Sequence, residues 1–161
     1  MEYHELEQPS SLSKKEKEDA MGSYLMMFAA MGAGLPLPII NLIAAIVYYF
    51  VQQKNSRFVR FHSMQSLYSQ IPTTLVNAGA VFWTLQIFLF KNMEVTDMYL
   101  GYLIMGAILN IAYFIFSIVG AVKARKGQMY YFLFFGKLCY HAVYQIRDEE
   151  GKEPVNQPPK I

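Results

Sequence analysis

The stretch that decides the fold class is YLGYLIMGAILNIAYFIFSIVGAV, which runs from Tyr99 to Val122. None of its side chains carries a charge. A helix needs about 20 mostly apolar residues to cross a hydrocarbon layer of ~30 Å. This segment is therefore the clearest transmembrane helix that the sequence predicts.

The acidic residues outside this stretch are also confined. All 12 of them lie in three patches: the N-terminal tail, the connection that holds Glu94 and Asp97, and the last residues from Asp148 onward. No carboxylate occurs at positions 20–93 or 98–147. Long spans without acids are typical of a chain that lives in lipid, where an isolated charge is costly.

The composition fits one small, largely lipid-embedded domain, since 54% of the 161 residues are hydrophobic and 16% are aromatic. A net charge of +2 without an exposed basic and aromatic cluster argues against nucleic acid as a partner. The single cysteine, Cys139, excludes an internal disulfide and a cysteine-based zinc site. We expect no cofactor and no metal. The polar start of the chain is unlike a secretory signal, so the first apolar region is expected to be retained.

Two further regions are long and apolar. Residues 66–90 can span once, whereas residues 22–51 are interrupted by two glycines and two prolines at positions 32–38. The interrupted region is either one kinked span or a hairpin of two short helices, 22–33 and 38–51. Residues 129–144 suit an amphipathic helix at the membrane surface.

These segments predict an all-α, polytopic integral membrane bundle. It has three full spans, or four membrane segments with the first broken by Gly and Pro, plus an amphipathic C-terminal helix. Its expected parts are a disordered polar tail (1–19), a helical membrane domain (20–146) and a polar C-terminal tail (147–161).

Basic residues predict the orientation. The connections 52–65 and 123–128 hold three Lys or Arg side chains each and no acid, so both are expected in the cytoplasm, with 91–98 on the other side. Lysines in the N-terminal tail favour the cytoplasm as well, which favours the hairpin for residues 22–51. The predicted location is the bacterial inner membrane.

A basic and aromatic block runs from Ser56 to Leu67. As a helix it presents aromatic side chains on one face and arginines on the next, typical of a helix lying in the membrane interface. It can equally be a positive-inside flank with no further role. Its interfacial motif is Arg57, Phe58, Arg60, Phe61, His62 and Gln65.

The same block, FVRFHSMQSL at positions 58–67, resembles the signature of the chloroplast inner-envelope protein-import component family. That family contains the twenty-kilodalton subunit of the TIC translocon and has uncharacterised bacterial relatives. The segment AVKARKGQMY, from Ala121 to Tyr130, is similar to another part of the family pattern. The block has Ser66 where the family usually has alanine, and no acid follows it. The resemblance implies a four-segment helical membrane protein tied to protein translocation.

Polar residues recur at helical spacing in the second and third regions. In lipid, such a face must meet another helix or water. It therefore indicates either hydrogen bonding between helices or a polar conduit or partner-binding groove. The polar helix face consists of Ser66, Ser69, Thr73 and Asn77, starting from His62, together with Asn110 and Ser117.

Enzyme signatures and paired intramembrane acids are missing from the sequence, so we expect no catalytic activity. The favoured function is a subunit or assembly partner of a membrane complex, related to protein translocation. The alternative is an oligomeric channel or small-solute permease lined by the polar face of residues 62–77. The expected partners are the lipid bilayer and other membrane proteins or further copies of the chain.

Overall fold

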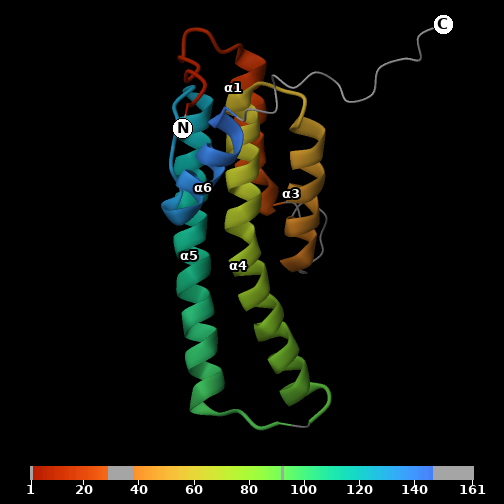
Figure 1. Ribbon diagram of the computed structural model, residues 1–161. Helices are drawn as coiled ribbons and strands as arrows, with labels where there is room; N and C mark the ends of the chain where they lie inside the picture. Colours follow the sequence, from red (N-terminus) through yellow and green to blue (C-terminus); the bar gives the residue numbers. More distant parts are fainter. Residues whose placement is uncertain (1, 29–37, 92, 147–161) are drawn as a thin grey trace, which may run out of the picture.

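The computed structural model describes residues 2–28, 38–91 and 93–146, and within these ranges the protein is all-α (Figure 1). This confirms the all-α part of the predicted fold class. The described part forms no named strand, only an isolated antiparallel bridge between Tyr3 and Gln145. The helices are α1 (Lys14–Leu25), the 3-10 helix η1 (Met26–Phe28), α3 (Pro38–Gln52), α4 (Arg57–Phe88), α5 (Asp97–Arg125) and α6 (Leu133–Tyr144).

Helices α4 and α5 form a long antiparallel hairpin whose far half extends beyond the other helices (Figure 1). They are the two described helices that are long and apolar enough to cross a membrane. The apolar stretch 39–52 of α3 is too short to cross alone, so the predicted three or four full spans are not confirmed. The predicted Gly and Pro break at positions 32–38 lies outside the described residues except for Pro38.

The lengths of α4 and α5 define two zones in the molecule. At ~1.5 Å per residue, about 20 residues cover a ~30 Å hydrocarbon layer. Counting that many residues from the connection between the helices leads from Asp97 to Ser117 on α5, and from Phe88 to Tyr68 on α4. The first turns of α4 and the last turns of α5 then extend past the hydrocarbon. We call this the basic end, and the opposite tip the loop end.

Helix α1 and helix α3 lie side by side and run in opposite directions. The Tyr48 hydroxyl near the end of α3 donates to the Asp19 carbonyl of α1 at 2.7 Å, and Asn55 Nδ2 donates to the Asp19 carboxylate at 3.3 Å. Gly22 permits this approach, because a Cβ there would lie 2.6 Å from the Tyr48 hydroxyl. The described parts of the first apolar region therefore return to the basic end, where they started.

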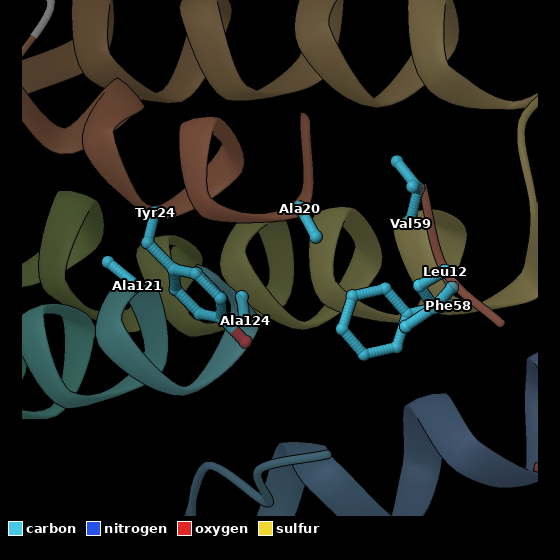
Figure 2. Packing of buried hydrophobic residues seen from close by; sticks show 7 residues of the cluster. All are labelled: Leu12, Ala20, Tyr24, Phe58, Val59, Ala121 and Ala124. Atoms are coloured by element: carbon cyan, nitrogen blue, oxygen red, sulfur yellow. The ribbon is translucent and has the colours of Figure 1, made fainter. Parts of the chain in front are cut away.

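Helix α1 is a packed element, which differs from the disordered tail expected for residues 1–19. Its N-terminus is closed by a capping box, in which Ser13 and Glu16 bond each other's backbone N–H groups. Its buried face joins α4 and α5 in one apolar cluster: Leu12, Ala20, Tyr24, Phe58, Val59, Ala121 and Ala124 (Figure 2). Gly120 of α5 leaves room for the Tyr24 ring, since a Cβ there would lie 2.8 Å from Tyr24 Cε1.

Helix α6 packs on the first turns of α4, with Cys139 and Tyr144 buried while Phe134 on its outer face is 86% exposed. The segment before α1 lies against the end of α6, where the His4 N–H donates to the Tyr144 carbonyl at 2.8 Å. Burial raises the pKa of the Cys139 thiol to about 12. The predicted C-terminal tail, 147–161, lies outside the described residues.

Candidate functional site

A buried polar cluster joins α1, α4 and the segment before α6 at the basic end. The Tyr24 hydroxyl lies 2.8 Å from His62 Nδ1, and Gln65 Nε2 donates to the same hydroxyl at 2.6 Å. All three side chains are almost completely buried. Burial raises the pKa of the Tyr24 hydroxyl, so it stays protonated and neutral. The cluster is thus a chain of hydrogen bonds among neutral and polar side chains.

Gln65 also holds the backbone that leads into α6. Its Nε2 donates to the Tyr130 carbonyl at 2.9 Å, and its Oε1 accepts from the Phe132 N–H at 3.0 Å. Both amide hydrogens and the amide oxygen are thus used inside the protein. The side chain positions the turn at 130–132 against α4, which is a structural role.

The structure divides the predicted interfacial motif into two groups. Phe58, Phe61, His62 and Gln65 are fully buried in protein, whereas Arg57 and Arg60 are partly exposed. An interfacial helix would turn its aromatic side chains toward acyl chains, but Phe58 and Phe61 face protein, because α1 and α6 cover that face of α4. Arg57 Nη2 lies 3.2 Å from His4 Nε2 at the edge of the molecule.

The predicted polar helix face is mostly used for contacts between helices and with its own backbone. Ser66 Oγ donates to the Ser23 carbonyl of α1 at 2.7 Å. Ser69 and Thr73 donate to carbonyls three residues earlier in α4. Asn77 of α4 and Asn110 of α5 bond each other, and the Ser117 side chain is buried between helices. The pattern fits hydrogen bonding between helices, the first of the two interpretations of this face.

A pocket of about 340 Å³ opens beside this face, between the ends of α1 and α3 and the middle of the hairpin. Its walls combine apolar rings, among them Phe28 and Phe114, with amide and hydroxyl side chains such as Asn77 and Thr74. No charged residue lines it within the described part of the chain. The sequence indicated its α4 and α5 walls but gave no sign that Met27, Phe28 and Asn41 would complete it.

The loop end carries a different chemistry. Glu94 and Asp97 are exposed there, close to Lys91, and Thr96 caps α5 by accepting from the Tyr99 N–H at 3.2 Å. Within the described residues, no group of three His, Cys, Asp or Glu side chains could hold a metal ion. These carboxylates thus form an open surface rather than a closed coordination site.

Comparison with known proteins gives one match. The sequence model of the magnetosome magnetite crystal formation protein family covers residues 17–139. No curated protein and no solved structure matches the chain.

This match corrects the resemblance inferred from residues 58–67. The chain is not matched to the chloroplast protein-import component family, so that assignment and the protein-translocation role are wrong. The alternative of a channel or small-solute permease is not supported either. The matched segment includes α3, α4 and α5 in full, so the family pattern covers the whole hairpin.

Proposed function

The chain belongs to the magnetosome magnetite crystal formation protein family, and on this premise we propose that it takes part in magnetite crystal formation as a non-catalytic protein of the magnetosome membrane. Proteins of this family are membrane-associated, and the two long apolar helices are compatible with insertion. The family match is the observation that carries the proposal. Other membrane proteins, or further copies of the chain, remain predicted partners.

The distribution of charge supports an orientation for this protein. The basic side chains of residues 52–60 and 123–126 gather at the basic end, where α4 begins and α5 ends. Basic connections favour the cytoplasmic side of a membrane. The loop end, with Glu94 and Asp97, then faces the interior of the magnetosome, where the crystal grows.

The loop end offers chemistry that suits an iron oxide surface. Carboxylate oxygens are hard ligands that bind hydrated metal cations, and both carboxylates are exposed. Two acids on an open loop cannot enclose an ion, but they can contact cations at a mineral surface. We therefore propose a surface contact between Glu94, Asp97 and the growing crystal, with no catalytic step.

A complementation experiment in magnetosome-forming cells, with crystal size as the readout, tests this function. A strain that lacks the chain is complemented with the wild type, with Glu94→Gln plus Asp97→Asn, or with Glu2→Gln plus Glu5→Gln, which removes two exposed acids at the basic end. Electron microscopy of the crystals should show restoration by the wild type and by the basic-end variant, and incomplete restoration by the loop variant. Crystals that are unchanged when the chain is absent would refute the function. Full restoration by the loop variant would refute only the role of the loop.

A further inference from the structure

A cleft on the outer side of α6 has no role in the function proposed above. Its volume is about 510 Å³, and it is lined by Tyr3, Tyr131, Leu133, Lys137, Tyr140 and His141. Among the described residues no carboxylate side chain lines it, whereas a lysine, three tyrosines and a histidine do. Hydrogen-bond donors and a cation without a lining acid suit an anion.

The cleft is built from packed rings and a constrained backbone. Tyr3 stacks on Tyr140 with ring centroids 5.3 Å apart, and its hydroxyl lies 2.7 Å from His141 Nδ1. Tyr131 lies directly against α6, because a Cβ on Gly136 would sit 2.5 Å from Tyr131 Cβ. Leu133 adopts a φ of 40°, a conformation that residues with a side chain rarely take. The walls are thus formed by contacts within the fold.

The depth of the cleft places it at the level of lipid headgroups. Phe132, just before α6, has its ring centroid 5.3 Å from that of Phe116 on α5. Phe116 precedes Ser117, the residue at which α5 reaches the boundary of the ~30 Å hydrocarbon layer. Helix α6 runs from this level to the basic end, where the Tyr144 hydroxyl donates to Glu7. Lys137 in the middle of α6 therefore lies above the acyl chains and among the headgroups.

The helix face next to the cleft is apolar and uncovered. Phe134 and Leu138 are 86% and 55% exposed, one helical turn apart, and Leu133 at the mouth of the cleft is 57% exposed. Apolar side chains at the boundary of the hydrocarbon pack against acyl chains, while lysine extends toward the headgroups. The anion in the cleft is therefore expected to carry acyl chains.

We propose that this cleft binds the phosphate diester of an acidic phospholipid, with Lys137 on the phosphate and the acyl chains along Leu133, Phe134 and Leu138. The phenol hydroxyls of Tyr131 and Tyr140 are further donors to the phosphate oxygens. Partial desolvation raises the pKa of the half-exposed Tyr131 hydroxyl, which stays protonated and able to donate. The bound lipid would fix the position of α6 relative to the bilayer.

The test is a binding titration on the full-length protein in mild detergent. The probe is a short-chain fluorescent phosphatidylglycerol, and the competitors are unlabelled phosphatidylglycerol, phosphatidylcholine and inorganic phosphate. We expect saturable binding that phosphatidylglycerol displaces much more effectively than the other two. Lys137→Gln should weaken binding about tenfold, the loss of one charge-assisted hydrogen bond, while Lys137→Arg should retain it.

The matched control is Lys126→Gln, which removes an exposed cation from the basic end outside the cleft. It should leave the affinity unchanged, and thermal unfolding followed by circular dichroism should be alike for all variants, since both lysines are exposed. Equal losses for Lys126→Gln and Lys137→Gln would overturn the proposal, since they indicate general attraction to acidic lipid. Displacement by inorganic phosphate as effective as by the lipid would also overturn it, as would binding that does not saturate.

Discussion

Asn77 and Asn110 hold the two long helices together through a reciprocal pair of amide hydrogen bonds, 2.9 Å and 2.7 Å long. Asn77 lies 11 residues before the end of α4, which is ~16 Å along the helix and thus near the middle of a ~30 Å hydrocarbon layer. An amide pair at this depth fixes the register of α4 against α5, because a shift of either helix would break both bonds and leave Asn110 only the bond from its Nδ2 to the Gly106 carbonyl within α5, 2.7 Å long.

The pair should show strong coupling between its two members. Asn77→Leu or Asn110→Leu alone removes both bonds between the helices and leaves the amide oxygen of the other asparagine without its donor, so each should lower the free energy of unfolding by about 1–2 kcal/mol. The double variant should cost clearly less than the sum of the two. Unfolding in mixed detergent micelles measures all four proteins of this double-mutant cycle. Additive losses would mean that the two amides do not interact.

Gln65 should control the attachment of α6. Gln65→Leu keeps the volume but leaves the Phe132 N–H and the Tyr130 carbonyl without their partner. We expect a loss of about 2 kcal/mol in the free energy of unfolding, the usual cost of stranding buried polar groups. Hydrogen exchange should speed up at the Phe132 amide.

The control for this change is Gln53→Leu, at an exposed position after α3. It should alter neither the stability nor the exchange rate at Phe132. If Gln65→Leu exchanged as slowly at Phe132 as the wild type, the turn before α6 would be held by other contacts.

The Cys139 thiol should react slowly in the folded protein. It should also make the free energy of unfolding fall as the pH rises into the alkaline range. Burial raises its pKa to about 12, so hardly any thiolate exists at pH 8. Because the pKa in the folded protein is the higher one, the stability linked to this group is fully present below the pKa of the unfolded thiol. It is lost as the pH rises toward 12.

Reaction with a chromogenic disulfide reagent at pH 8 measures this directly. The thiol should react slowly in mild detergent and rapidly after unfolding in dodecyl sulfate. Cys139→Ser should weaken the loss of stability between pH 9 and about 12. Rapid reaction of the folded protein would show that α6 opens readily.

The two ends of the hairpin should be accessible from opposite sides of the membrane. In a Cys139→Ser background, Met93→Cys marks the loop end and Gln128→Cys marks the basic end, and both positions are exposed. On isolated magnetosomes an impermeant maleimide should label the cysteine at 128 at once and the cysteine at 93 only after detergent is added. Labelling of both without detergent would contradict the proposed orientation.

The sequence was most informative where the apolar interior of a membrane restricts which residues a helix can carry. The uncharged stretch 99–122 lies within α5, and helical spacing placed Asn77 and Asn110 on polar faces. Spacing alone could not show that these two residues meet, because that requires the alignment of one helix against another. Connections and composition do not determine this alignment.

Sequence rules based on polarity failed where a side chain can be buried equally well in a protein core or in lipid. Phe58 and Phe61 suit acyl chains or a protein core equally well, and the choice depended on α1 and α6 covering them. Charged residues 14–19 suggested a tail, although the pairing of Ser13 with Glu16 is a readable signal for a helix start. The resemblance at residues 58–67 rested on a short block whose side chains serve local packing, and such a block does not specify function.

The uneven coverage of the hairpin has a mechanical consequence. Helices α1, α3 and α6 all flank the half of α4 and α5 next to the basic end, and the far half stands without them (Figure 1). In the membrane orientation proposed above, the protein takes up more area in one leaflet than in the other. A protein with this wedge shape fits best where the leaflet that holds its wider half is stretched. It would therefore gather on tightly curved vesicles, with the basic end on the convex surface.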